Sequence, residues 1–248
     1  MIYLLAKTKK HLTLLQRSLI VTIIVCLTSC AELQQVVDNL PENAPQLSNA
    51  DIAMGLRQAL NQGIDQQVSS LMQEDGFYKN DLVKILLPEE LQKVDKALRN
   101  VGLSNLADEG LKLLNRAAED AVKTATPIFI EAVKEITFAD AKAILLGNND
   151  AATQYLAQKT KAPLYQQFHP VINNSFNNVG ANTIWTSIIE TYNDLPFTSD
   201  VNPNLTDYVT EEALKGVYKM IAIEENAIRT SYKSRTTTIL KQVFALQD

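Results

Sequence analysis

The chain has 248 residues, 46% of them hydrophobic and 21% charged, and its formal net charge at pH 7 is -5. These values indicate a globular protein of one large domain or at most two small ones, and the net negative charge gives no reason to expect a nucleic-acid partner. With two cysteines and two histidines, a disulfide scaffold and most metal sites built from His and Cys are excluded.

The first 30 residues have the pattern of a bacterial export signal. Four basic residues and no acidic residue precede or enter an apolar run at residues 18–27, which is about the length of a signal-peptide core and too short to span a bilayer. The run leads into Leu27, Thr28, Ser29 and Cys30, which resembles the lipobox of bacterial lipoproteins. An ordinary secretory signal with a chance cysteine is the alternative.

The lipobox resemblance implies that the sulfur of Cys30 carries a diacylglycerol, that residues 1–29 are removed, and that the new amino group is acylated. Each buried methylene contributes about 0.8 kcal/mol, so two or three acyl chains would anchor the protein durably in a membrane. Ala31 follows Cys30, where Asp commonly retains lipoproteins in the inner membrane. We therefore expect the periplasmic leaflet of the outer membrane, with the inner membrane as the alternative.

Cleavage would change the composition of the protein. It removes four of the 23 basic residues and none of the 28 acidic ones, which leaves 19 basic residues and a net charge of -9. Cys30 would be the only cysteine of the mature chain, and His169 its only histidine.

Residues 30–47 are expected to form a flexible tether, because Pro41 and Pro45 interrupt any helix and polar residues dominate. An arm packed on the domain is the alternative. After the tether, Ser48 and Asp51 predict a helix start of the capping-box type, and hydrophobic residues then recur every three or four positions up to about Gly76.

The remainder of the chain is also predicted to be helical, apart from a short extended piece that residues 77–87 leave open. The clearest helix, residues 104–125, carries a broad stripe of small residues that would let neighbouring helices approach closely, so we place it centrally. A bend or break is predicted near Pro170. Other helices are predicted to begin at Pro88, Thr137, Asp150, Thr183, Thr210 and Ser234.

These patterns predict an all-α protein. No βαβ series, fixed-period repeat or change of composition divides the chain. We expect a signal peptide (1–29), a lipidated tether (30–47) and a single irregular bundle of about ten helices (48–248).

Four segments, at residues 82–88, 115–122, 141–156 and 207–229, together resemble the bacterial lipoprotein family catalogued as domain of unknown function 4197. The resemblance covers about residues 52–245 and implies an exported, largely helical protein with no established activity. Ser231 and Tyr232 depart from the Asp-Pro-like turn expected there, which leaves the helix break at this point open.

Catalytic motifs are missing from the sequence. His169 would have to serve any Ser-His-Asp site, but no G-x-S-x-G elbow accompanies it, and a structural or surface histidine is the better interpretation. There is no H-E-x-x-H, C-x-x-C or phosphate-binding loop of the Walker type. We therefore expect neither a metal site nor a cofactor.

Two polar groups on predicted helices are the main candidates for a site. Our first interpretation is a structural polar network, with an ion pair between Glu225 and Arg229; the sharper hypothesis is that the groups converge and line a ligand cleft. The turn before the helix at Asp150 gives weaker candidates for an anion site. The groups are Asn115, Arg116 and Glu119; Glu224, Glu225 and Arg229; and the anion-site candidates Asn149, Asp150 and Thr153.

The leading hypothesis for function is a non-enzymatic periplasmic lipoprotein that is held in the membrane by the lipid on Cys30 and binds an envelope protein or supports the envelope. The first alternative is a helical module that binds a small amphiphile between its helices. The second is an enzyme without a recognisable motif, in which His169 would be tested first.

Overall fold

The computed structural model describes residues 47–88, 91, 92, 96, 99, 100, 102, 104–183, 186, 190 and 204–248. The predictions for the signal peptide, Cys30 and the tether up to residue 46, and most of the predicted helix at 183–195, therefore lie outside the described residues. Within the described ranges the elements are helices and no strand occurs, which confirms the all-α prediction.

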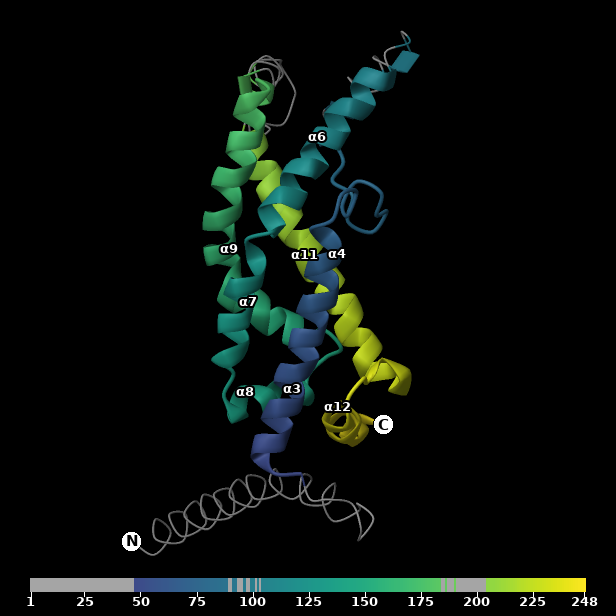
Figure 1. Cartoon of the computed structure of the whole chain (residues 1–248), viewed down its shortest axis with the longest axis vertical. Helices are drawn as coiled ribbons and strands as arrows, with labels where there is room; N and C mark the ends of the chain where they lie inside the picture. The colour runs from purple at the N-terminus through teal and green to yellow at the C-terminus, as the bar shows by residue number, and fades with distance from the viewer. Residues whose placement is uncertain are drawn as a thin grey trace, which may run out of the picture. The chain divides into compact units, whose positions relative to one another are not determined.

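Eight α-helices are described, together with one π-helical and two 3-10 turns (Figure 1). They are α3 (Asn49–Gly63), η1 (Ile64–Val68, π), α4 (Ser69–Leu71), α6 (Ser104–Val122), α7 (Ala125–Lys134), α8 (Phe138–Leu145), α9 (Ala151–Asn178), α11 (Leu205–Thr230), η2 (Tyr232–Ser234, 3-10), α12 (Thr238–Phe244) and η3 (Ala245–Gln247, 3-10).

Local sequence determines two of the helix starts. The Ser48 side chain accepts a hydrogen bond from the backbone N–H of Asp51 at 3.2 Å, and the Asp51 carboxylate accepts one from the N–H of Ser48 at 2.8 Å. Thr137 and Asp140 make the same reciprocal pair at the start of α8. Both capping boxes satisfy N–H groups that have no partner within the helix, and both predicted starts are confirmed.

The predicted break near Pro170 is wrong, because α9 is a single helix that contains both Pro163 and Pro170; a bend at this point stays a prediction. A proline inside a helix removes a hydrogen bond and costs about 3 kcal/mol. Both prolines lie on the exposed side of α9, whereas a buried stripe at every fourth residue continues past them. The stripe consists of Leu156, Thr160, Leu164, Phe168, Ile172 and Phe176, and its packing against α6, α7 and α11 outweighs the local preference.

One segment that the sequence left open and two helix starts that differ from the sequence-based expectation complete the comparison. Residues 77–87 form turns and irregular backbone between α4 and the next helical residues, and no strand occurs at the extended piece that was left open. Helix α11 begins at Leu205 rather than Thr210, because Asn204 caps it by accepting from the N–H of Asp207 at 3.0 Å. The last helix begins at Thr238, and the chain from Tyr232 to Ser234 forms the 3-10 turn η2 instead.

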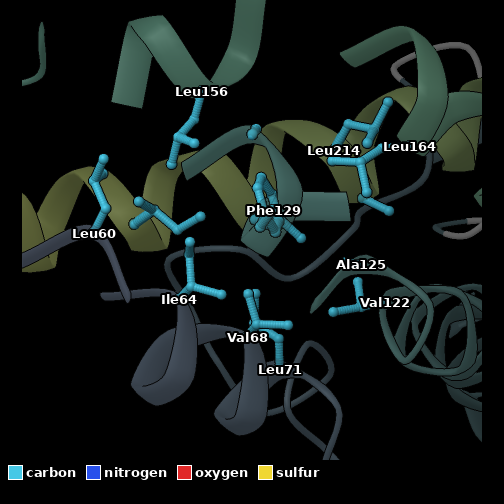
Figure 2. Packing of buried hydrophobic residues seen from close by; sticks show 14 of the residues in the cluster. Leu60, Ile64, Val68, Leu71, Val122, Ala125, Phe129, Leu156, Leu164 and Leu214 are labelled. Carbon is cyan, nitrogen blue, oxygen red and sulfur yellow. The ribbon is translucent and has the colours of Figure 1, made fainter. Parts of the chain in front are cut away.

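The hydrophobic core is continuous and is contributed by every long helix (Figure 2). Leu60, Ile64 and Val68 line up along α3 and η1 and face Phe129 of α7 and Leu156 of α9. Helix α6 packs against α9 and α11 through alanines that are almost completely buried: Ala117, Ala118 and Ala121. The small side chains of α6 therefore allow the close helix approach that the sequence predicts.

Candidate functional site

Asn115 of α6 holds the extended segment that follows α4. Its side chain is fully buried; Oδ1 accepts from the N–H of Ile85 at 2.8 Å, and Nδ2 donates to the carbonyl of Ile85 at 2.9 Å. The amide thus pairs with both backbone groups of one residue, as a neighbouring β-strand would. Without Asn115 these buried groups would lack partners, at a cost of about 1–3 kcal/mol each.

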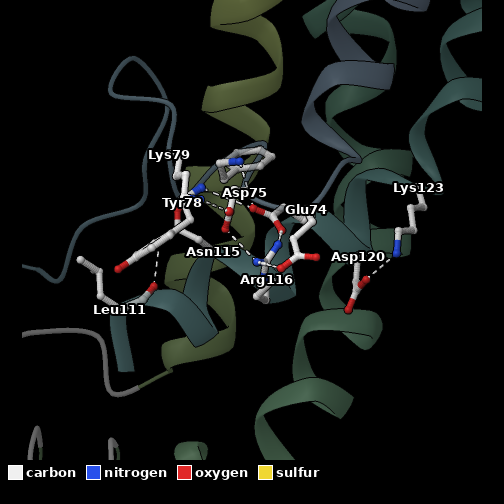
Figure 3. A network of polar contacts seen from close by, with 11 residues as sticks. Glu74, Asp75, Tyr78, Lys79, Leu111, Asn115, Arg116, Asp120 and Lys123 are labelled. Atoms are coloured by element: carbon white, nitrogen blue, oxygen red, sulfur yellow. Dashed lines mark hydrogen bonds and ion pairs between the residues drawn. The ribbon is translucent and has the colours of Figure 1, made fainter. Parts of the chain in front are cut away.

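Glu119, one helical turn after Asn115, holds the beginning of the same segment. Its Oε1 accepts from the N–H groups of Phe77 and Tyr78 at 3.1 and 3.3 Å, and Oε2 accepts from Nη1 of Arg116 at 2.7 Å. Nη2 of Arg116 continues to Glu74 and Asp75 at 2.6 and 2.7 Å (Figure 3). A hydrogen bond from Lys79 lowers the pKa of the Asp75 carboxyl below its usual value.

Helix α11 contacts the segment from its other side. Tyr208 Oη donates to the carbonyl of Leu86 at 2.8 Å, and Lys219 Nζ donates to the carbonyl of Leu82 at 2.7 Å. A Cβ atom on Gly216 would lie 2.8 Å from a ring carbon of Phe77, so only glycine allows the segment to approach α11 this closely. We call residues 76–87, which α6 and α11 hold in this way, the pinned segment.

Glu225 of α11 caps the N-terminus of α9. Its carboxylate is buried and accepts from the N–H of Ala152 at 2.9 Å and from both the N–H and the hydroxyl of Thr153 at 2.8 Å. Asp150 occupies the N-cap position, but its side chain makes no capping bond to the helix; the prediction that Asp150 caps α9 is therefore wrong in this respect. The start of α9 does attract an anion, and the anion is a side chain of the same protein.

Arg229, four residues after Glu225, caps the C-terminus of α8. It donates to the carbonyls of Ile144 and Leu145 at 2.9 and 3.2 Å, and its Nε and Nη2 bind Oε1 of Glu225 at 3.0 and 2.9 Å. The ion pair predicted between these residues is confirmed. One acid and one base on α11 thus satisfy opposite ends of two consecutive helices, each with the charge that the helix dipole favours.

Arg235 is a fourth buried charge, after Glu119, Glu225 and Arg229, and sequence reasoning missed it. Its side chain is 1% exposed and donates to the carbonyls of Ile228 and Arg229 at 3.0 and 2.9 Å, while two guanidinium nitrogens bind the carboxylate of Asp248 at 2.6 and 2.7 Å. Arg235 lowers the pKa of the Asp248 carboxyl below its usual value by hydrogen bonding. The local sequence around Arg235 is polar, so no periodicity marks the residue as buried.

Glu224 lies beside Glu225 but has different partners. Gln62 and Gln67 donate to its two carboxylate oxygens at 3.1 and 3.2 Å. Gln67 follows Gln62 by five positions, which an α-helix would place on different faces. Gln67 lies within the π turn η1, which widens the helix so that both glutamines reach Glu224.

The two predicted polar groups belong to separate networks. Asn115, Arg116 and Glu119 hold the pinned segment, whereas Glu225 and Arg229 cap helix ends; in the described part of the chain, no hydrogen bond or ion pair links one group to the other. These bonds agree with the first interpretation, a structural polar network, and show no convergence on one cleft.

A small cavity borders the second network. It lies among α3, α9, α11 and α12, is lined mainly by apolar side chains together with Glu225 and Arg229, and has a volume of about 10 Å³. A buried water needs about 10–15 Å³, so this cavity has room for about one water molecule.

His169 lies half-buried on α9, with its ring centre 5.5 Å from that of Tyr165. The Tyr165 hydroxyl donates to Asp207, and this hydrogen bond, with burial, raises the pKa of Tyr165 to about 12. Tyr165 also borders a shallow surface groove together with Lys161 and Glu211, which form an ion pair at 3.0 Å. Asn149 is exposed in the turn before α9.

Within the described ranges, no three His, Cys, Asp or Glu side chains are grouped in a way that could hold a metal ion. Among the described helices, none combines the length and the apolar composition that crossing a bilayer requires.

Comparison with known proteins gives one match. The family model described as "Protein of unknown function (DUF4197)" matches residues 46–245. No curated protein and no solved structure matches the chain.

Proposed function

Because the chain belongs to the DUF4197 family of proteins of unknown function, we propose its role from its own residues. It is a lipoprotein of the bacterial envelope, held in the periplasmic leaflet of the outer membrane by the lipid on Cys30. Its helical body binds a partner protein and carries out no chemistry of its own.

One observation carries the non-enzymatic part of the proposal. Each buried polar residue of the described ranges has a hydrogen-bond partner within the chain, and the one buried side-chain atom without a partner there is Nε of half-buried Arg57, whose Nη2 donates to the carbonyl of Ile136. The buried polar residues are Asn115, Glu119, Thr153, Thr160, Thr206, Thr210, Glu225, Arg229 and Arg235. Catalytic groups commonly lie in clefts, where burial and nearby charges shift their pKa values. Here the buried charges hold helix ends and the pinned segment, which supports a stable binding body.

The sequence before residue 47 supports the membrane anchor. The basic residues, the apolar run and the Leu27–Cys30 tetrapeptide occur in the order that lipoprotein export requires, and Ala31 favours the outer membrane. The sulfur of Cys30 is nucleophilic and is therefore the atom that accepts the diacylglyceryl group.

Fractionation of cells tests the anchor. We expect the wild-type chain to incorporate a labelled fatty acid and to appear with the outer membrane, whereas Cys30→Ser abolishes incorporation. The matched control is Cys26→Ser, which alters the other cysteine of the signal region. The proposal fails if Cys30→Ser retains the label, and the outer-membrane assignment fails if the labelled wild-type chain fractionates with the inner membrane.

In-cell crosslinking tests the binding role. We expect crosslinking through surface lysines to give one reproducible protein adduct from the lipidated chain. Catalysis replaces this role if the purified protein turns over a substrate and His169→Ala removes that turnover without unfolding the protein.

A further inference from the structure

The pinned segment presents two leucines to solvent. Leu82 and Leu86 are 52% and 55% exposed, whereas Val83 and Ile85 between them are buried. Leu82 lies in the turn at residues 81–83, Leu86 lies in the irregular stretch that follows, and Lys84 between them is half-buried, so the outward side carries Leu82, Lys84 and Leu86. We call this side the Leu82–Leu86 face.

The backbone of this face is held in place by side chains from two helices. Asn115 binds both backbone groups of Ile85, and Lys219 and Tyr208 bind the carbonyls of Leu82 and Leu86. The close contact between Phe77 and Gly216 fixes the same segment against α11. Exposure of the two leucines is therefore a consequence of the fold, since their backbone cannot turn inward without breaking these bonds.

The charge around the Leu82–Leu86 face is opposite to that of the body. Residues 1–46 hold four basic and three acidic residues, which leaves 19 basic and 25 acidic residues, a net charge of -6, in residues 47–248. Residues 76–87 carry Lys79, Asp81 and Lys84. Lys79 is paired with Asp75 at 2.7 Å, so the positive charge of the face comes from Lys84 and from exposed Lys219 beside Leu82. Lys84 lies over the ring of Tyr78, 4.3 Å from its centre.

Leucine flanked by lysine and tyrosine matches the interface of an anionic bilayer. Apolar side chains enter the acyl boundary, aromatic rings with a polar tip lie at headgroup level, and lysines bind lipid phosphates. A second copy of the chain is a poorer occupant, because a twofold contact would place the positive charges of the face against themselves.

The tether is long enough for the anchor and the face to share one bilayer. Residues 31–46 can extend to about 55 Å at 3.3–3.6 Å per residue. The 23 residues from Asn49 to Leu71, which lead from the tether to the pinned segment, span about 35 Å at 1.5 Å per residue.

We propose that the Leu82–Leu86 face rests in the headgroup region of the membrane that holds the Cys30 lipid, so that the body lies against the bilayer in one orientation. This inference rests on the proposed lipid anchor. Leu82 and Leu86 enter the acyl boundary, and Lys84 and Lys219 contact anionic phosphates.

Site-specific fluorescence on the lipidated chain tests the proposal. Leu82→Cys and Leu86→Cys are labelled with an environment-sensitive probe in vesicles of phosphatidylethanolamine and phosphatidylglycerol that contain brominated acyl chains. The control is Leu146→Cys, which is 62% exposed and follows α8. Acylated Cys30 does not take the label, and cleavage removes Cys26. We expect blue-shifted, strongly quenched emission at 82 and 86 and unquenched emission at 146.

Replacing phosphatidylglycerol by phosphatidylcholine should reduce the quenching at 82 and 86. Quenching at 82 and 86 no stronger than at 146 would overturn the proposal, and so would crosslinking of 82 to a second copy without quenching. The intact mass of the same sample separates this inference from the anchor. A lipidated chain with unquenched labels refutes the face alone; an unlipidated chain refutes the anchor, on which the inference rests.

Discussion

Substitution of Glu225 by Gln should strongly destabilise the fold. The carboxylate accepts two N–H groups and one hydroxyl at the start of α9 and also pairs with Arg229. Gln keeps the shape of the side chain, but one carboxylate oxygen becomes an NH2 group, which cannot accept a hydrogen bond. In either orientation this group would face donors, either the N–H groups at the start of α9 or the guanidinium of Arg229.

The expected loss in the free energy of unfolding follows from the burial of this ion pair. The side chains of Glu225 and Arg229 are 7% and 3% exposed. Removing one partner of a buried ion pair leaves the other charge uncompensated and costs about 3–5 kcal/mol. Gln keeps one acceptor, and Arg229 keeps its two carbonyl partners, so we expect the free energy of unfolding to fall by about 3 kcal/mol.

The assay is urea unfolding of residues 47–248, followed by circular dichroism. Glu212→Gln is the matched control, because Glu212 lies on the same helix in an ion pair with Lys215 whose side chains are 31% and 67% exposed, and such a pair contributes at most about 1 kcal/mol. The combined Glu225→Gln and Arg229→Met variant should lose less than the sum of the single losses, by about 1–3 kcal/mol. Equal losses for Glu225→Gln and Glu212→Gln would refute the capping role.

Three further predictions concern the pinned segment and the core. Asn115→Ala should cost about 2–6 kcal/mol, because it leaves two buried backbone groups without partners. Hydrogen exchange of residues 77–87 should speed up, and unchanged exchange would contradict the pinning. Gly216→Ala should lower the free energy of unfolding by about 1–3 kcal/mol, because the new methyl group overpacks against Phe77. Its control is Gly110→Ala on an open face of α6, which should raise the free energy of unfolding by about 0.5–1 kcal/mol. Equal unfolding free energies for the two variants would refute this difference. Burial raises the pKa of Tyr218 from 10.0 to about 12. Between these pH values the unfolded chain ionises Tyr218 while the folded chain keeps the proton, so stability falls as pH rises. Tyr218→Phe should reduce this pH-dependent loss of unfolding free energy by about 1–2 kcal/mol. An unchanged slope of unfolding free energy against pH would contradict the prediction.

Features that depend on nearby residues could be predicted from the sequence. The capping box of Ser48 with Asp51 and the pair of Glu225 with Arg229 lie within one helical turn, and the small-residue stripe of α6 follows directly from helical spacing. Such interactions depend on the spacing of residues within one helix and not on how the rest of the chain folds.

Features that depend on distant contacts could not be predicted. Pro163 and Pro170 remain inside α9 because the opposite side of the helix is packed, which overrides local preference. Glu119 meets the pinned segment across 42 residues of sequence, and Arg235 is buried only because the end of α11 and Asp248 meet around it.

The mass of the intact protein, extracted from the membranes of cells that produce the full chain, tests the central proposal most directly. The proposal predicts a chain from Cys30 to Asp248 that carries a diacylglyceryl group on sulfur and a third acyl chain on the amino group. A chain that retains residues 1–29, or that begins elsewhere without lipid, would contradict it.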